Sequence, residues 1–445
     1  MSKTKNKKKK MSSFKIIVLG FAGLIVLGAL ILMLPVSSRS GAVTPFNEAL
    51  FTSVSSVCVT GLVVQDTGSY WSSFGQAVIL LLIQIGGLGV VTVAVSFAML
   101  SGRKISLMQR STMQDSISAP KVGGIVRLTK FILLGTFIVE LIGAIAMLPV
   151  FIKDYGLKGI WMSVFHSVTA FCNAGFDIMG TQSNPFVSIT EYSADPVINI
   201  TVMILIIVGG IGFLTWYDII ANKFKVKRYR LQSKIILLTS LILILLPAVY
   251  FFVFDYSDLT LGKRLLASLF QAVTPRTAGF NTTDISQMTG ASKAIMVFLM
   301  LVGGSPGSTA GGMKTTTIAV LIMNALSTFR RKEDTEMFSR RIDSSIVKNA
   351  STLFVMYISL ALIGSIIISS VENLPFSQCL FETASAVGTV GLTLGITPYL
   401  GIVSQIILML LMFLGRVGGL TFIYATVTNY NLKRSKLPLE KITVG

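Results

Sequence analysis

The chain has 445 residues, of which 52% are hydrophobic and only 13% are charged. Soluble globular domains average about 25% charged residues, so this composition excludes an ordinary soluble protein and indicates a membrane protein. Lysine and arginine outnumber aspartate and glutamate by 38 to 19, a formal net charge of +19. Nucleic-acid binding is not needed to explain the excess, because membrane topology and attraction to anionic lipid at the inner leaflet account for it.

Apolar runs long enough to cross a bilayer, for which about 20 residues suffice, recur along the chain. In chain order, uncharged runs cover 16–38, 67–102, 196–217, 235–254, 294–313, 349–371 and 383–415, and a further run at 128–152 contains a single acid, Glu140. The pattern predicts an all-α polytopic membrane protein with eight transmembrane helices.

Most of the lysine and arginine residues lie in alternate connections between these runs. They gather in 1–15, 103–130, 223–234 and 330–348 and after residue 432. Because short loops rich in Lys and Arg stay on the cytoplasmic side, we expect a multi-pass protein of the cell membrane with both termini in the cytoplasm.

A motif ending in glycine recurs four times. Each copy has a phenylalanine and a stretch too short to span, at 47–58, 161–172, 264–275 and 376–387. The copies end in Val59-Thr60-Gly61, Asn173-Ala174-Gly175, Thr277-Ala278-Gly279 and Thr389-Val390-Gly391. Non-helical backbone at membrane depth survives only where it is buried in protein or lines a water-filled path. We therefore expect four helix–pore loop–helix repeats around a central pseudo-fourfold pore.

These four segments are expected to form a cation filter that binds K⁺. Rings of inward-facing carbonyl groups can replace the water shell of a dehydrated potassium ion, glycine permits the backbone dihedrals that this needs, and the C-terminal ends of short helices favour a cation. Acids in the predicted outer connections either attract cations to the mouth or are ordinary solvated residues; they are Asp66, Asp177, Asp255, Asp258 and Asp284.

A second glycine motif follows each predicted filter segment, at 86–89, 209–212, 303–306 and 415–418. In the first two copies, close helix packing is favoured over a kink. The third copy has too many glycines for a stable helix, and we expect an unwound gate loop. Its gate residues are Gly303, Gly304, Ser305, Pro306, Gly307, Gly311, Gly312 and Lys314.

Arg416 is a charged residue within an apolar run and aligns with this loop. An intramembrane charge is a functional candidate, and about 4 Å from a passing ion it would cost roughly 4 kcal/mol at an effective dielectric of about 20. We expect Arg416 and the glycine-rich loop to form a barrier beneath the filter. The alternative is that Arg416 pairs with helix-end carbonyl groups or with an acid.

With filter glycines at Gly61, Gly175, Gly279 and Gly391, the chain resembles the Trk/Ktr/HKT superfamily of cation transporters, and its size and Lys-rich start resemble the bacterial KtrB membrane subunit most. The resemblance implies a non-enzymatic potassium uptake subunit. In some plant members a serine at the first filter position accompanies sodium transport, so Gly61 favours potassium. Only the fourth copy resembles the Thr-Val-Gly of potassium channels, and a sodium-preferring or poorly selective transporter is the alternative.

The resemblance also implies partners and ions. KtrB-like subunits are homodimers on a cytosolic, KtrA-like ring of nucleotide-binding regulatory subunits, with sodium as an activator. This chain has no dinucleotide-binding pattern, so ATP or ADP is expected on the partner, and neither the lone His166 nor the three cysteines suggest a cofactor.

The repeats divide the chain into six parts. They are a cytosolic N-terminus (1–13), repeat 1 (14–102), a cytosolic loop with repeat 2 (103–220), a loop with repeat 3 (221–328), a loop with repeat 4 (329–430) and a cytosolic tail (431–445).

Overall fold

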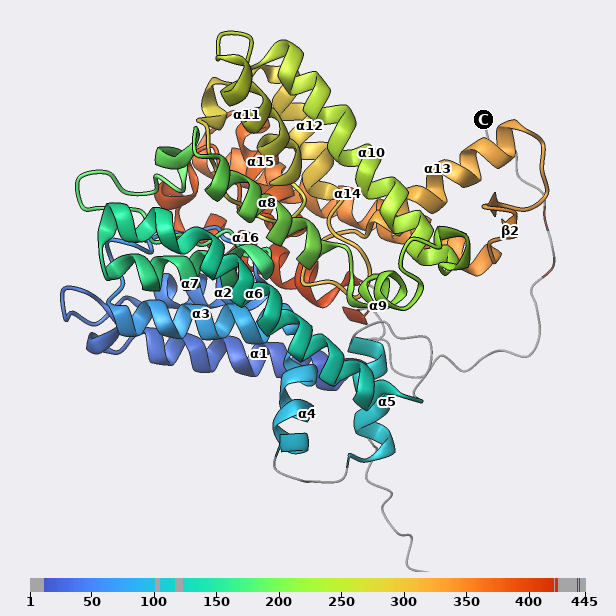
Figure 1. Ribbon diagram of the computed structural model, residues 1–445, viewed down its shortest axis with the longest axis horizontal. Coiled ribbons are helices and arrows are strands. Elements are labelled where there is room, and N and C mark those ends of the chain that lie inside the picture. The colour runs from blue at the N-terminus through green and yellow to red at the C-terminus, as the bar shows by residue number, and fades with distance from the viewer. Residues whose placement is uncertain are drawn as a thin grey trace, which may run out of the picture.

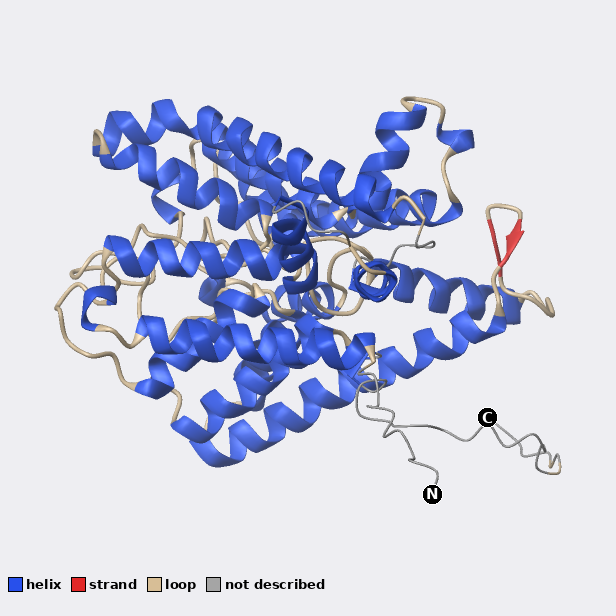
Figure 2. Cartoon of the chain, turned by 90° about the horizontal axis from the view of Figure 1, so that it is seen from below, coloured by secondary structure: helices blue, strands red, loops and turns tan. Residues whose placement is uncertain are grey.

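The computed structural model describes residues 12–100, 105–116, 123–419, 421–422, 438 and 440. The Lys-rich start before residue 12 and nearly all of the expected tail 431–445 lie outside these ranges. The described chain is mostly helical, and its strands form one short antiparallel hairpin, β1 (Glu336–Met337) and β2 (Arg340–Arg341), as Figure 2 shows.

The same order of helices occurs four times along the chain (Figure 1). A long helix comes first: α1 (Ser13–Leu32), α6 (Ile125–Tyr155), α10 (Leu231–Phe254) and α14 (Ser344–Glu372). A short helix follows: α2 (Phe46–Cys58), α7 (Lys158–Phe171), α11 (Leu261–Val273) and α15 (Phe376–Gly388). The next helices are α3 (Ser73–Leu88) with α4 (Val90–Leu100), α8 (Pro196–Gly210) with α9 (Phe213–Asn222), α12 (Gly290–Leu301) with α13 (Thr315–Phe329), and α16 (Ile402–Val417). Helix α5 (Leu107–Ser116) lies between the first two repeats.

Short 3₁₀ turns complete the described secondary structure. They are η1 (Pro35–Ser37), η2 (Thr190–Tyr192), η3 (Val226–Arg228), η4 (Ile285–Gln287) and η5 (Thr397–Tyr399).

Within the described residues, four helices are long and apolar enough to cross a membrane, and the count rises to six if each of two bent pairs is one span. The bent pairs are α3 with α4, at 97°, and α8 with α9, at 98°. The predicted runs 67–102 and 196–217 therefore each contain two helices, with a bend at the glycine motif where close packing was favoured over a kink. The cause is local: Gly89 and Gly212 have φ of +87° and +88°, a conformation that a right-handed helix cannot contain.

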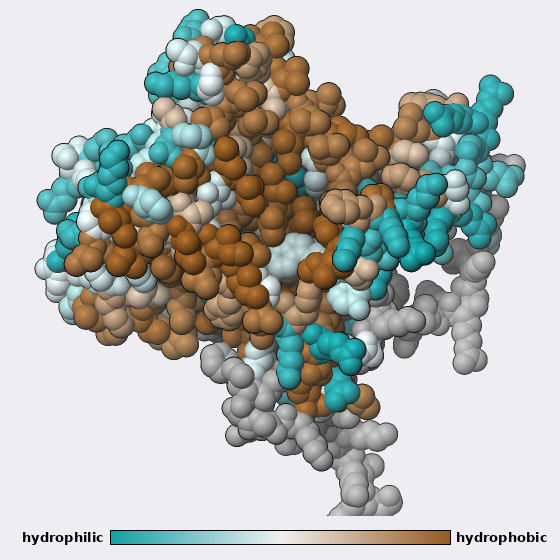
Figure 3. Space-filling model, in the orientation of Figure 1, coloured by the Kyte–Doolittle hydropathy of each residue, from teal (hydrophilic) through white to brown (hydrophobic). Residues whose placement is uncertain are grey.

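Apolar residues cover the outside of the helical body as well as its interior. In Figure 3 a hydrophobic surface lies between hydrophilic groups at two ends of the molecule. Leu141 of α6 and Leu246 of α10 are 60% and 68% exposed. Meanwhile the phenylalanine of each repeated motif is fully or almost fully buried: Phe51, Phe165, Phe270 and Phe381. An apolar exterior of this extent fits a lipid environment, and the protein is a multi-pass membrane protein.

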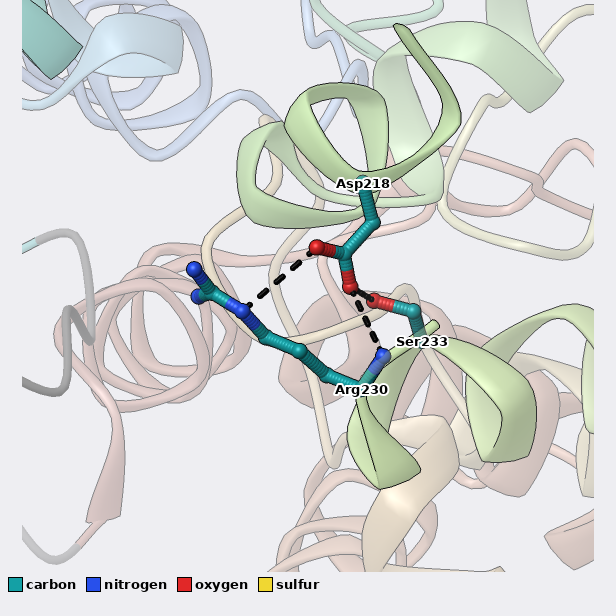
Figure 4. A network of polar contacts seen from close by, with 3 residues as sticks. All are labelled: Asp218, Arg230 and Ser233. Atoms are coloured by element: carbon teal, nitrogen blue, oxygen red, sulfur yellow. Dashed lines mark hydrogen bonds and ion pairs between the residues drawn. The ribbon is translucent and has the colours of Figure 1, made fainter. Parts of the chain in front are cut away.

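A buried carboxylate connects the second repeat with the third. Asp218 of α9 accepts a hydrogen bond from the Ser233 hydroxyl of α10 at 2.6 Å and another from the Arg230 backbone N–H at 3.2 Å. The Arg230 guanidinium lies 3.4 Å from the same carboxylate (Figure 4). Since Asp218 satisfies the free N–H at the start of α10, it holds the bent end of the second repeat against the third.

Candidate ion pathway

The four predicted filter segments meet around one point. A β-carbon added to Gly61 would come within 3.0 Å of the carbonyl oxygen of Ala174, in the next repeat. The same relation holds for Gly175 and Ala278, for Gly279 and Val390, and for Gly391 and Thr60. Each repeat therefore touches the next and the fourth touches the first, so the four segments close a ring with no space for side chains at the glycines.

The backbone has the same unusual form in all four segments. The glycines have φ between +67° and +92°, and the residue two positions earlier also has positive φ: Val59, Asn173, Thr277 and Thr389, at +52° to +68°. The residue between these two positions does not have a positive φ. None of the carbonyl groups of these filter residues accepts a hydrogen bond from another described residue. Unpaired carbonyl groups of this kind are what a ring that replaces the water shell of a potassium ion requires.

Hydroxyl side chains at the ends of the short helices support the segments. Ser55 accepts a hydrogen bond from the Gly61 N–H, and Ser385 accepts one from the Gly391 N–H, both at 3.1 Å. Thr274 instead donates to the Phe280 carbonyl at 2.7 Å. The predicted filter residues did not include these, although a hydroxyl residue at the corresponding place in all four copies, with Thr169 in the second, is a signal in the sequence.

The glycines form part of the wall of a cavity of about 590 Å³. Gly61, Gly175, Gly279 and Gly391 all line it. Three of the acids noted in the sequence, Asp66, Asp177 and Asp284, line it too, whereas Asp255 and Asp258 do not. Hydrogen bonding from Ser286 lowers the pKa of the Asp284 carboxyl from its ordinary value, which keeps this group ionised at neutral pH.

The residue after the repeated phenylalanine has a different role in the fourth repeat than in the second. Glu382 is buried and accepts hydrogen bonds from the Thr393 hydroxyl and the Leu394 N–H at 2.6 and 2.9 Å. At the same place in the second repeat, His166 is buried, stacks on Phe151, and its Nδ1 lies 2.8 Å from the Met162 carbonyl. Among the described residues, no group of three or more His, Cys, Asp or Glu side chains could hold a metal.

The second glycine motif packs against the short helices. β-carbons on Gly86, Gly209 and Gly415 would each collide with a carbonyl group four residues before a filter glycine: Val57, Phe171 and Val387. The motif thus provides the close packing expected of its first two copies, but in those copies it also ends the helix, at Gly89 and Gly212. Gly418 repeats that conformation after α16, with φ of +87°.

The third copy is a non-helical loop between α12 and α13, and it lies under the filter. Its base is closed by a bridge between Val302 and Met313. A β-carbon on Gly311 would collide with the side chain of the filter residue Thr389. The loop contacts the second and fourth repeats through hydrogen bonds, from the Ser305 N–H to Gly210, the Phe213 N–H to Gly307, the Thr309 hydroxyl to Phe171 and the Gly312 N–H to Gly415.

The other predicted gate residues pack within the loop. Gly303 faces the Gly311 carbonyl, Gly304 faces the Ala310 side chain, and the Pro306 carbonyl lies against Gly212. The Lys314 ammonium donates to the carbonyl groups of Ala310 and Gly311 at 2.8 and 3.0 Å.

Arg416 connects three parts of the pathway. Its guanidinium donates to the carbonyl of Thr309 in the loop and to those of Gly86 and Gly87 at the end of α3, the last at 2.9 Å. The alternative of helix-end carbonyl partners is therefore seen at Gly86 and Gly87, while the barrier beneath the filter stays a prediction. Lys314 and Arg416 also line a second cavity of about 180 Å³ that contains no filter residue.

The ring of four related glycines lies next to the glycine-rich loop, which reaches the filter residue Thr389 through Gly311. A family model described as a cation transport protein, TrkH, matches residues 1–433. The chain belongs to the TrkH family of cation transport proteins. Its members, and this chain among them, are ion transporters and not enzymes.

Individual proteins similar to this chain are also described as ion transport proteins. The potassium/sodium uptake protein NtpJ of Enterococcus hirae is 38% identical over 99% of each chain. The Ktr system potassium uptake protein B of Bacillus subtilis is also 38% identical, over 92% of each chain. The crystal structure of the potassium transporter TrkH from Vibrio parahaemolyticus has the same fold, with a TM-score of 0.74 at 18% identity over 96% of this chain and 87% of that one.

Proposed function

We propose that the chain is the ion-translocating membrane subunit of a potassium uptake system, with K⁺ passing through the ring of Gly61, Gly175, Gly279 and Gly391. The observation that carries the proposal is the ring itself. Each filter glycine lies against the carbonyl group of the residue just before the filter glycine of the next repeat. The free oxygen atoms suit a dehydrated cation, and the acids of the adjoining cavity raise the local cation concentration.

A sodium-preferring or poorly selective transporter is the second candidate. It is favoured by the similarity to a protein described as a potassium/sodium uptake protein and by the differences among the four filter segments. Relatives named as Ktr system components are described as potassium uptake proteins, and Gly61 stands at the first filter glycine position, which supports potassium.

Flux measurements in liposomes containing the purified chain separate these candidates. Potassium flux well above sodium flux, lost or made unselective by Gly61→Ser, is the expected result. Equal sodium and potassium flux in both proteins would support the poorly selective transporter instead.

We further propose that the loop from Gly303 to Lys314, with Arg416, gates the pathway. The loop contacts Thr389 of the filter on one side, and Arg416 holds it to α3 through Thr309, Gly86 and Gly87. If neither Arg416→Ser nor deletion of 305–312 changed ion flux, the loop would not be a gate.

The proposed arrangement in the membrane has eight spans in four repeats, with boundaries at 14–102, 103–220, 221–328 and 329–430 and both termini in the cytoplasm. The bent pairs α3 with α4 and α8 with α9 would each count as one span, as would α12 with α13. The basic connections support this orientation.

The proposed partners are a second copy of the chain and a cytosolic, KtrA-like ring that binds ATP or ADP, with Na⁺ as a possible activator. Relatives named as proteins of a Ktr system support a subunit role. A homogeneous monomer in mild detergent that binds no such ring would contradict both partners.

A further inference from the structure

The second cavity has an unfavourable charge for a cation pathway. Lys314 and Arg416 both line it, and two positive charges repel a cation. Nearby backbone oxygens do not compensate fully, because Lys314 engages those of Ala310 and Gly311 and Arg416 engages that of Thr309. A negative group at this cavity would offset that repulsion for a cation that has passed the gate loop.

Among the described residues that line this cavity, one is an acid: Asp115, near the end of α5. It is exposed, and it has no hydrogen-bond or ion-pair partner in the described chain. Neither Arg416 nor Lys314 neutralises it by a direct ion pair, so its charge is available to a mobile ion.

Helix α5 is fixed in place rather than loosely attached. Met113 is fully buried and the Thr112 hydroxyl donates to the Ser13 hydroxyl of α1 at 3.3 Å. Ser116, next to Asp115, lies close to Gly89, at the bend between α3 and α4: a β-carbon on Gly89 would be 3.2 Å from the serine oxygen. The end of α5 is thus held against the same cavity wall as the Arg416 contacts at Gly86 and Gly87.

We propose that Asp115 is the cation-attracting group of the inner cavity and speeds ion passage between the gate loop and the cytoplasm. This inference rests on the proposed transport function. The Asp115 carboxylate offsets the field of Lys314 and Arg416 and lowers the barrier on the inner side of the loop, while the filter sets which ion passes. Asp115 therefore affects the rate of flux and not the preference for potassium over sodium.

Charge at this position can be changed chemically in one variant, Asp115→Cys. The native cysteines Cys58, Cys172 and Cys379 are buried, so methanethiosulfonate reagents should leave the wild-type chain unmodified. The purified full chain is labelled in detergent with a sulfonate-bearing or a trimethylammonium-bearing reagent, the extent of labelling is measured by mass spectrometry, and potassium flux is then measured in liposomes at low ionic strength. Glu333→Cys is the matched control, because Glu333 is an exposed acid that does not line the cavity.

Asp115→Cys should lose about fivefold in potassium flux, the effect of one unit charge about 4 Å from an ion in water. The sulfonate should restore flux toward the wild-type value and the trimethylammonium group should lower it further, with the potassium-to-sodium ratio unchanged. The same labels on Glu333→Cys should have little effect.

Equal effects of the two reagents, no effect of either, or failure of the thiol to react would overturn the role of Asp115. Wild-type chain that conducts no potassium would instead contradict the proposed transport function, so the two failures are distinguishable.

Discussion

The carbonyl oxygen of Thr60 lies where a β-carbon of Gly391 would be, so residues from the first and last repeats are in direct contact. The other three contacts of this kind, each between a filter glycine and a carbonyl group of the next repeat, join the first repeat to the fourth through the second and third, and this contact closes the ring. It also means that any side chain at Gly391 displaces the backbone of the first repeat, not only its own.

Gly391→Ala should therefore remove most potassium flux while the protein still folds. The added β-carbon would collide with the Thr60 carbonyl, and the φ of +92° is unfavourable for alanine. The matched control is Gly262→Ala in the short helix α11, where a β-carbon meets no atom within 4 Å. Potassium flux in liposomes tests the loss of transport, and elution on size-exclusion chromatography tests whether the variant is folded. Normal selective flux in Gly391→Ala would contradict a ring with no space for a side chain at this glycine.

Ser385→Ala should weaken ion selectivity more than stability. The variant removes the acceptor of the Gly391 N–H, and an unsatisfied buried group costs about 1–3 kcal/mol. Because that group belongs to the filter, we expect a lower potassium-to-sodium permeability ratio. Ser385→Thr should behave almost as wild type, since threonine retains the hydroxyl and Thr169 and Thr274 occupy this place in other repeats. An unchanged ratio in the alanine variant would show that the bond is dispensable.

Arg416→Gln should increase potassium flux measured without any partner subunit. The substitution removes a positive charge and weakens the link from the gate loop to Gly86 and Gly87. A unit charge about 4 Å from the ion path opposes a cation by roughly 4 kcal/mol at an effective dielectric of about 20, so the increase could approach a thousandfold. Arg416→Lys retains the charge and should remain slow. Equal flux in the wild type and both variants would place the barrier elsewhere.

Asp284→Asn should raise the potassium concentration needed for half-maximal flux, mainly at low ionic strength, because salt screens the attraction of cations to the mouth. The pKa of Asp284 is below its ordinary value, so the carboxyl group is ionised at any pH above the ordinary pKa. Its attraction for cations is lost only as the pH falls through the lowered pKa. The effect should thus be the same at pH 6 and pH 8. Asp258→Asn is the control, since Asp258 does not line the cavity; an equal effect there would argue for general surface charge.

Much of the helix order could be predicted from the sequence, because repeated motifs and apolar runs are local signals. The bends at Gly89 and Gly212 were missed, since hydropathy is continuous through them and depends on composition rather than on φ. Contacts between distant segments, such as Arg416 with Gly87 and Gly391 with Thr60, could not be derived from one sequence. They depend on how the four repeats close around an axis, which no local pattern encodes.

The most direct test of the central claim is the reversal potential of the purified chain in a bilayer with potassium on one side and sodium on the other, compared with Gly279→Ser. The account predicts a strongly potassium-selective potential for the wild type that moves toward zero in the variant, because the third glycine contacts Val390 of the fourth repeat. A wild-type potential near zero, or one identical in the two proteins, would contradict a potassium filter formed by the four glycines.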